Sequence, residues 1–282
     1  MERKEKTTQT QIKPKLFLSD VDGTLIERIP VIQKKDIAAI QKWKQQGNAF
    51  GLVTGRGKVF CESLMESTGK PADVYVVSNG AEVFYQDQCI YESLIDVDTT
   101  RSIFKELLPY LGQCYPFLTV EDGSHYFPIK AMGQEAFEWI KEIRADLKNF
   151  NDQDLFEYLE KREKGCAKLS IYTQHIKNTR ELLPIFKEKF PQVKVEKTSV
   201  DYIEIVNKET DKAAACKHFL ELEKNQFSEV FYIGDGENDI NVFRLLEHTY
   251  VMKQAHPMVK QEAKQEVEGL WQAIEERLDE NV

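Results

Sequence analysis

The sequence predicts an α/β protein that combines a parallel sheet with a second, inserted α/β domain. Short apolar runs alternate with amphipathic helical stretches, and each run ends in small or polar residues. Between the third and the fourth run, residues 86–198 carry helix and strand signals of their own. We therefore expect a loose tail over 1–13, a first domain formed by 14–85 and 199–282, and an inserted domain over 86–198.

The four apolar runs predict buried strands at residues 16–18, 50–53, 74–77 and 230–233. The helical stretches after the first two runs repeat apolar residues on one face, namely Ile37, Ile40 and Trp43, then Phe60, Leu64 and Met65. In open α/β sheets, ligands bind beyond the carboxyl ends of the strands. The polar clusters that follow the four runs should therefore converge on one site.

The inserted domain has two predicted helices and one predicted strand. The first helix carries an apolar face of Phe137, Ile140, Ile143 and Leu147, and the strand covers 169–172. The second helix contains Leu182, Leu183, Ile185 and Phe186, and Pro184 should interrupt it near its start.

The first polar cluster contains two carboxylates separated by one residue, Asp20 and Asp22. Residues two apart point to the same side of an extended segment, and Gly23 then permits a tight turn. Two adjacent acids repel each other, so a divalent cation or a retained proton is expected between them. An isolated Asp-x-Asp-Gly is more often only a turn, so the catalytic interpretation depends on the other clusters.

The order of the clusters resembles the haloacid dehalogenase superfamily of phosphotransferases. Its four motifs match Asp20-Val21-Asp22-Gly23-Thr24-Leu25, Thr54-Gly55-Arg56, Lys212 and Gly234-Asp235-Gly236-Glu237-Asn238-Asp239, in this order. The insertion, preceded by Ser78-Asn79-Gly80-Ala81, is similar to that of the sugar-phosphatase-like Cof-type branch, subfamily IIB. This resemblance implies a Rossmann-like core with a parallel sheet and a large α/β cap.

Two positions depart from the pattern that this branch often shows. Ala213 follows the third-motif lysine where Gly is common, and Gly236 stands where the fourth motif often has Ser. Alanine is a good helix former, so the first change should matter little. Gly236 removes a hydroxyl near the expected metal, which leaves a coordination position to a backbone carbonyl or to water.

The resemblance implies a Mg²⁺-dependent phosphatase in which Asp20 is the nucleophile and Asp22 the general acid and base. A phosphate monoester is a dianion, so an attacking carboxylate needs nearby positive charge. The implied phosphate-binding residues are Thr54, Gly55, Lys212 and Asn238. The implied magnesium site comprises Asp20, the main-chain carbonyl of Asp22, Asp235 and, as a further ligand or an acid behind the ligands, Asp239.

Several assignments keep a plainer alternative. Lys212 could be a solvated residue at a helix start with Asp211 as its N-cap, and Arg56, which contacts either phosphate or an acid, stays outside the catalytic set. Resemblance to Cof-type members favours sugar phosphates as substrates. Phe117, Glu121, His125 and Tyr126 could line a sugar pocket, although ordinary packing and surface roles are the favoured explanation of this pattern.

Two other functions use the same residues. A phosphomutase would return the phosphate to a bound sugar, and a sensor would bind a phosphorylated ligand without turnover. Other motifs fail on spacing: Lys58 is followed by Val59 rather than Ser or Thr of a P-loop, and Leu25 occupies the position of the glycine of an EF-hand loop. The five cysteines and five histidines contain no zinc motif.

Composition indicates a cytoplasmic protein. The 282 residues are 41% hydrophobic, which suffices for two packed domains. The five cysteines are scattered and odd in number, and no apolar stretch approaches the ~20 residues that cross a bilayer. A net charge of −9 argues against nucleic acid as a partner. We expect a small phosphorylated metabolite and no membrane partner; a monomer is compatible with the sequence, which does not fix the oligomeric state.

Overall fold

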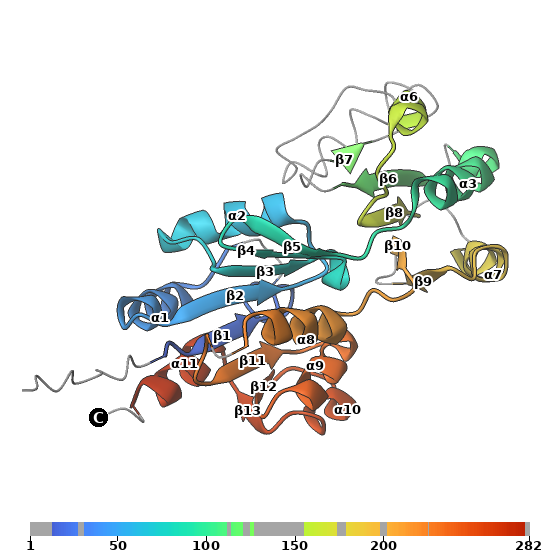
Figure 1. Cartoon of the computed structure of the whole chain (residues 1–282). Helices are drawn as coiled ribbons and strands as arrows, with labels where there is room; N and C mark the ends of the chain where they lie inside the picture. Colours follow the sequence, from blue (N-terminus) through green and yellow to red (C-terminus); the bar gives the residue numbers. More distant parts are fainter. Residues whose placement is uncertain are drawn as a thin grey trace, which may run out of the picture.

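The computed structural model describes residues 13–27, 31–111, 114–120, 125–126, 155–173, 179–197, 202–224 and 226–279. These residues form two sheets with helices packed against them (Figure 1). The expected tail lies outside the described residues except for Lys13, whose carbonyl accepts a hydrogen bond from the Ser228 hydroxyl.

The larger sheet has eight strands and contains all four predicted strands. Its spatial order is β13 (Gln265–Val267), β12 (His248–Met252), β11 (Val230–Gly234), β1 (Leu16–Ser19), β2 (Ala49–Val53), β3 (Val74–Val77), β4 (Glu82–Tyr85) and β5 (Gln88–Glu92). All pairs from β13 to β3 are parallel, and β4 and β5 add an antiparallel edge. The carboxyl ends of β11, β1 and β2 therefore lie side by side, with Ser19 opposite both Ile233 and Leu52.

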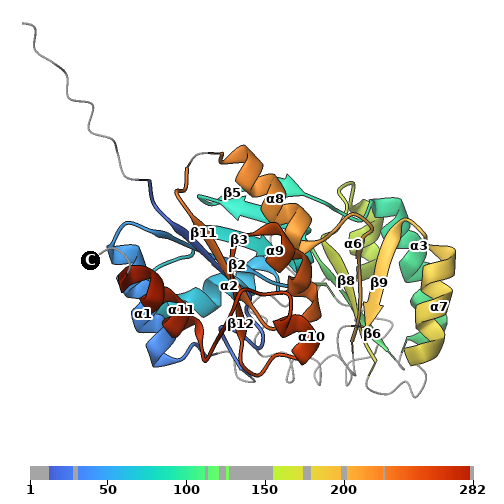
Figure 2. The same cartoon turned by 90° about the horizontal axis from the view of Figure 1, so that it is seen from below.

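Helices cover both faces of this sheet, as expected for parallel strands. One face packs against α1 (Lys34–Gln45), α2 (Lys58–Met65) and α11 (Leu270–Asp279), and the other against α8 (Lys212–Leu222), α9 (Ile240–Leu245) and α10 (Pro257–Lys260) (Figure 2). The predicted apolar faces in 37–43 and 60–65 belong to α1 and α2.

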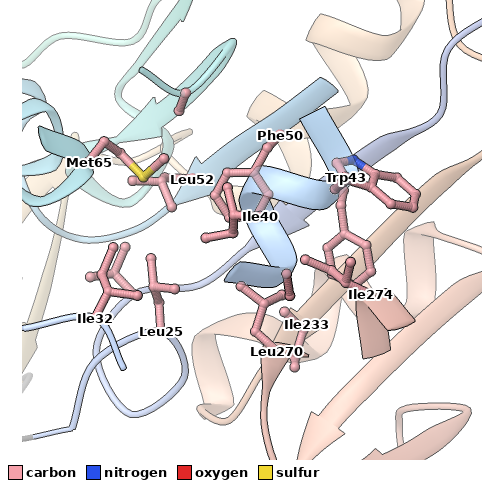
Figure 3. Close-up of a cluster of buried hydrophobic side chains, with 14 of the residues drawn as sticks. Leu25, Ile32, Ile40, Trp43, Phe50, Leu52, Met65, Ile233, Leu270 and Ile274 are labelled. Atoms are coloured by element: carbon pink, nitrogen blue, oxygen red, sulfur yellow. The ribbon is translucent and has the colours of Figure 1, made fainter. Parts of the chain in front are cut away.

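The first face includes the fully buried Trp43 (Figure 3). Its ring meets Phe17 of β1 edge to face, with 5.8 Å between ring centroids, and its indole N–H donates to the Ala49 carbonyl. A buried indole N–H requires such an acceptor. Strand alternation sends Leu16 and Leu18 to the opposite face, where they pack with residues of α8 and α9.

The smaller sheet has five antiparallel strands in the order β7 (His125–Tyr126), β6 (Tyr115–Thr119), β8 (Lys168–Tyr172), β10 (Tyr202–Asn207) and β9 (Val193–Lys197). Apolar side chains on one face pack against α3 (Val97–Leu107), α6 (Leu155–Lys161) and α7 (Thr179–Lys189). We call this sheet with its helices the cap. None of the helices in the described segments is long and apolar enough to span a membrane.

Two strands next to the expected domain boundaries pair with the sheet on the other side of the boundary, and this pairing favours shifted boundaries. β5 (Gln88–Glu92) belongs to the core sheet, because the turn at Gln86 and Asp87, both with positive φ, folds it back onto β4. β10 (Tyr202–Asn207) belongs to the cap, where it pairs with β8 and β9. We propose boundaries near Ser93 and Lys208, where the two connections are joined by a hydrogen bond from the Asn207 side chain to the Leu94 carbonyl.

The strand predicted over 169–172 is β8, and the helix predicted around Leu182 and Phe186 is α7. This helix continues through Pro184 rather than being interrupted there, and the burial of Leu182 and Phe186 on either side holds it in place. The helix predicted from Phe137 to Leu147 lies outside the described residues.

Candidate active site

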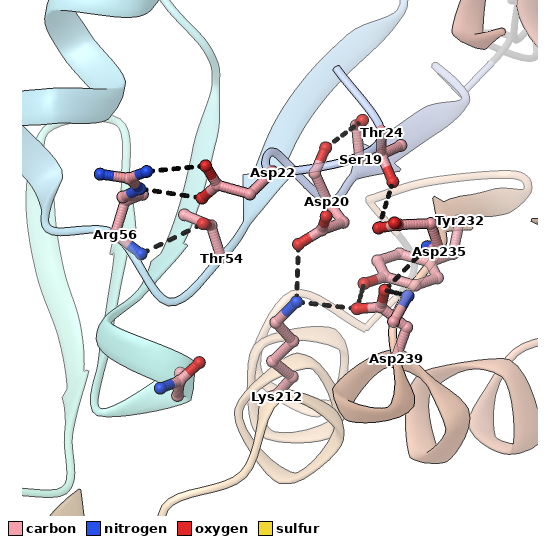
Figure 4. A network of polar contacts seen from close by, with 12 residues as sticks. Ser19, Asp20, Asp22, Thr24, Thr54, Arg56, Lys212, Tyr232, Asp235 and Asp239 are labelled. Carbon is pink, nitrogen blue, oxygen red and sulfur yellow. Dashed lines mark hydrogen bonds and ion pairs between the residues drawn. The ribbon is translucent and has the colours of Figure 1, made fainter. Parts of the chain in front are cut away.

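Three predicted site residues meet at the carboxyl ends of β1 and β11 and at the start of α8 (Figure 4). The Asp20 N–H donates to the Ile233 carbonyl, which continues the pairing of β1 with β11 by one residue. The Lys212 ammonium lies 2.7 Å from an oxygen of Asp20 and 2.7 Å from an oxygen of Asp239. Sequence motifs separated by 192 residues are thus joined through one buried ammonium.

Lys212 begins α8, and Asp211 caps that helix by accepting hydrogen bonds from the Ala213 and Ala214 N–H groups. Asp211 is thus an N-cap, but the plainer alternative of a solvated Lys212 is wrong. Lys212 is only 2% exposed, so its charge is not solvated and needs the two carboxylates. Burial alone would lower the pKa of Lys212, but Asp20 and Asp239 outweigh it and raise this pKa above its usual value.

Asp239 is fully buried, and all its acceptor positions are occupied. One oxygen accepts from Lys212 and from the Tyr232 hydroxyl, which lies 2.6 Å away. The other accepts from the backbone N–H groups of Asp235 and Gly236, each at 3.0 Å. Asp239 therefore holds the loop that carries Asp235.

The sequence analysis did not single out Tyr232, and it gave Gly234 of the fourth motif no role of its own. The signal for Tyr232 is a hydroxyl in a buried apolar strand, which needs a polar partner. Gly234 is required because a Cβ there would lie 2.4 Å from an Asp239 oxygen.

Asp235 lies beside the turn that follows β1. Its carboxylate accepts a hydrogen bond from the Thr24 hydroxyl at 3.2 Å. Gly23 has a φ of +89°, and a Cβ there would lie 2.2 Å from an Asp235 oxygen, so only glycine lets the two loops approach. Carboxylate oxygens of Asp20, Asp235 and Asp239 lie within 4.8 Å of one another.

The site holds more negative than positive charge. Three carboxylates surround one ammonium, and burial raises the pKa of Asp20 to about 8, with further upward contributions from Asp239 and Asp235 and an opposing one from Lys212. Burial and Asp239 also raise the pKa of Asp235. A cluster that consists of oxygen donors and carries excess negative charge fits a hard divalent cation such as Mg²⁺.

The Asp22 side chain points away from this cluster toward Arg56. The Arg56 Nε and Nη2 groups donate to its two oxygens, both at 2.8 Å, and both side chains are partly exposed. The Arg56 guanidinium also lies over the Phe60 ring, 4.6 Å from its centroid. Of the two contacts considered for Arg56 from sequence, the structure shows the one with an acid.

The loop Thr54–Gly55–Arg56 follows β2 and is held by the turn after β3. The Thr54 carbonyl accepts from the Asn79 N–H, and the Arg56 carbonyl accepts from the Ser78 N–H, both at 2.9 Å. Ser78 and Asn79 both have positive φ, a costly conformation for the serine that the hydrogen bonds to this loop hold in place. In the part of the chain that the structure describes, the Gly55 N–H has no acceptor. It is thus available to an anion.

The other residues predicted for the site make no contact with the Asp20–Lys212–Asp239 cluster among the described contacts. Asn238 is exposed, with its side chain beside Gly236. Phe117 of β6 is buried and packs edge to face on Tyr202. His125 forms part of β7, but Glu121 and the side chains of His125 and Tyr126 lie outside what the structure describes.

Known proteins are similar to this chain in sequence and in fold. Residues 17–269 match the family model of the haloacid dehalogenase-like hydrolases. A Haemophilus influenzae protein that carries the provisional name of a phosphatase is 24% identical over 255 residues, which cover 86% of this chain and 87% of the relative.

Solved structures are similar over nearly the whole chain. A Thermotoga maritima protein has a TM-score of 0.78 at 22% identity, covering 93% of this chain and 97% of its own. A subclass IIB sugar phosphatase of the haloacid dehalogenase superfamily has a TM-score of 0.71 at 20% identity, covering 93% and 98%. At these identities the structural likeness shows the fold, whereas the family match extends over most of the sequence. The chain therefore belongs to the haloacid dehalogenase-like hydrolase family, as the order of its four motifs predicts.

Proposed function

We propose that this enzyme is a Mg²⁺-dependent phosphatase that hydrolyses small phosphorylated metabolites, with sugar phosphates as the favoured class. The observation that carries the proposal is the buried Asp20 carboxylate at the end of β1, bound by Lys212 and close to Asp235. The phosphatase names among the relatives and the likeness to a subclass IIB sugar phosphatase support it.

We assign the magnesium ligands to the Asp20 and Asp235 carboxylates and the main-chain carbonyl of Asp22. The four donors on Asp239 occupy both of its oxygens, so we infer that it stands behind the ligands and orients Asp235. When bound, the cation offsets the negative charge of the phosphate and of the attacking carboxylate.

The proposed reaction has two steps. An Asp20 oxygen attacks phosphorus, the bond to the ester oxygen breaks, and Asp22 donates a proton to the departing alkoxide. Water then attacks the aspartyl-phosphate, Asp22 accepts its proton, and the bond between phosphorus and Asp20 breaks. Because Arg56 holds both Asp22 oxygens, we infer that Asp22 gives up one of these contacts when it carries the proton.

The phosphoryl oxygens need donors that are already oriented. The Gly55 N–H is one, and the Thr54 hydroxyl is another. The Thr54 oxygen already accepts from the Arg56 N–H at 3.1 Å, which leaves its own proton for phosphate. Lys212 supplies positive charge beside Asp20, and Asn238 helps to orient the site. We also propose a cytoplasmic location, because the five scattered cysteines provide no framework of disulfides.

A phosphate-release screen over sugar phosphates, nucleotides and cofactor phosphates tests the proposal. We expect release with Mg²⁺, loss with EDTA, and a decrease of at least about a thousandfold in Asp20→Asn, since a nucleophile is lost. Asp98→Asn is the matched control, because that carboxylate is 85% exposed on α3. Undiminished release by the Asp20 variant would refute the assignment. Recovery of a phosphorylated isomer instead of free phosphate would indicate a mutase, and tight binding without turnover a sensor.

A further inference from the structure

Two charged residues of the cap reach the loop that we assign to phosphate binding. The Lys168 ammonium on β8 lies 2.7 Å from the Gly55 carbonyl oxygen and 2.6 Å from a carboxylate oxygen of Glu204 on β10. The other Glu204 oxygen accepts from the Asn79 side-chain amide at 3.1 Å. One ion pair of the cap thus bonds to both segments that shape the core loop.

The strand register explains why these two residues face the core. Lys168 pairs with Thr119 of β6, and a Cβ on Gly57 of the core would lie 3.6 Å from the Thr119 methyl group. The alternate residues Leu169 and Ile205 point into the apolar cluster under the cap helices. The face of the cap sheet opposite its helices therefore covers the loop.

Burial makes this pair costly unless every polar atom has a partner. The Lys168 and Glu204 side chains are 8% and 17% exposed. Both ends of this ammonium's contacts are defined: one is the Glu204 carboxylate and the other is the Gly55 carbonyl of the core. A buried charge aimed at one backbone carbonyl points to a task at that carbonyl.

The Gly55 carbonyl is one end of the peptide group whose other end is the Arg56 N–H. In a trans peptide these two groups point in opposite directions. The Arg56 N–H donates to the Thr54 hydroxyl oxygen at 3.1 Å, and this contact leaves the hydroxyl proton for another acceptor. Lys168 therefore fixes one end of a peptide whose other end orients Thr54, and its charge polarises that peptide.

We propose that Lys168 is a positioning residue that couples cap docking to the orientation of the Thr54 hydroxyl, with Glu204 as the counter-charge that holds it in place. This inference rests on the proposed phosphatase function. The contact between Lys168 and Gly55 exists only while the cap lies on the core, so phosphate meets an oriented loop only beneath the docked cap.

The test compares Lys168→Met, Lys168→Arg and the control Lys164→Met. Lys164 also joins cap and core, through an ion pair with Glu92, but it is exposed, and its partner lies on β5 rather than in the Thr54–Arg56 loop. The affinity for orthovanadate and for inorganic phosphate is measured by calorimetry with saturating Mg²⁺, beside kcat, KM and the Mg²⁺ concentration for half-maximal activity.

We expect Lys168→Met to weaken orthovanadate binding and lower kcat by about tenfold or more, because a misplaced donor is costly in a transition state. The Mg²⁺ concentration for half-maximal activity should stay within about twofold of the wild-type value, since we assign the cation to Asp20 and Asp235. Lys168→Arg should restore much of the loss by donating to the same carbonyl. Lys164→Met should bind and turn over like the wild type.

Wild-type vanadate affinity in Lys168→Met, or an equal loss in Lys164→Met, would overturn the inference. If Lys168→Met does not fold, Glu204→Gln takes its place in the same comparison and is held to the same outcomes. A wild type that binds phosphate but releases none from any ester would refute the proposed function while the binding comparison still decides on Lys168. A wild type that binds neither anion would overturn both.

Discussion

Exchanging Asp239 for asparagine should destabilise the protein far more than the same change at Asp235. Asp239 accepts four hydrogen bonds in full burial, whereas Asp235 accepts one side-chain bond, from Thr24. An asparagine at 239 keeps one acceptor oxygen and turns an NH₂ group toward two donors.

The magnitude follows from the lost contacts. Two hydrogen bonds to a charged group contribute about 1.5–3 kcal/mol each, and removing one partner of a buried ion pair costs about 3–5 kcal/mol. We expect Asp239→Asn to lower the free energy of unfolding by about 3–5 kcal/mol. Asp235→Asn should change it by less than about 1 kcal/mol, or raise it, because its pKa is raised and its charge is therefore disfavoured.

The assay is urea unfolding followed by the fluorescence of the core tryptophans, of which Trp43 is fully buried. It is run in EDTA and in Mg²⁺. The wild type should gain about 2.7 kcal/mol at a Mg²⁺ concentration a hundred times the dissociation constant, whereas Asp235→Asn should gain little. The opposite result would be that Asp235→Asn is the less stable variant in EDTA and that Asp239→Asn loses only the stabilisation by Mg²⁺. That result would refute the assignment of Asp235 to the metal and of Asp239 to holding the loop.

Three further predictions concern other parts of the core. Burial raises the pKa of Asp36 to about 6, so its charge opposes folding above that pH. Asp36→Asn should therefore add up to about 3 kcal/mol to the free energy of unfolding at pH 8. In urea titrations this gain should fade as the pH falls from 6 to 4. Gly80→Ala places a Cβ 2.4 Å from the Asp211 carbonyl oxygen, so it should cost activity and more stability than Gly47→Ala, which has positive φ but open space. Asp22→Asn should slow turnover about a hundredfold to ten-thousandfold without changing Mg²⁺ half-saturation, because its metal contact is assigned to the main chain.

Each of these predictions can fail in a distinct way. A stabilisation by Asp36→Asn that is constant with pH would show that its titration does not differ between the folded and unfolded states. Equal effects of the two glycine variants in thermal unfolding would show that contact with Asp211 is unimportant. A large rise in the Mg²⁺ requirement of Asp22→Asn would place its carboxylate on the metal.

The parallel core could be predicted because its strands and helices are encoded locally. Each strand is a short apolar run that ends in polar residues, and the amphipathic stretch around Ile40 and Trp43 has the spacing of one helical face. The convergence of Asp20 and Asp235 followed from the rule that strand ends meet at one edge of the sheet, whereas Lys212 was expected there only from the resemblance.

Pairing between distant strands could not be predicted in the same way. The alternating segment Tyr202–Asn207 fits either sheet by its pattern alone, and only its partners β8 and β9 place it in the cap. Tyr232 and Glu204 were missed for a related reason, since their roles depend on Asp239 and Asn79 across the fold. The direction of the Asp22 side chain also depends on a partner, Arg56, that lies 34 residues away.

The most direct test of the central claim is to trap the phosphorylated enzyme. The wild type is mixed with a hydrolysed ester and Mg²⁺, quenched within one turnover and treated with borohydride, which reduces an aspartyl-phosphate to homoserine. Mass spectrometry of the peptide that contains Asp20 should show homoserine at position 20, and Asp22 in the same peptide should remain unchanged. Full release of phosphate with no modification at Asp20 would contradict the account.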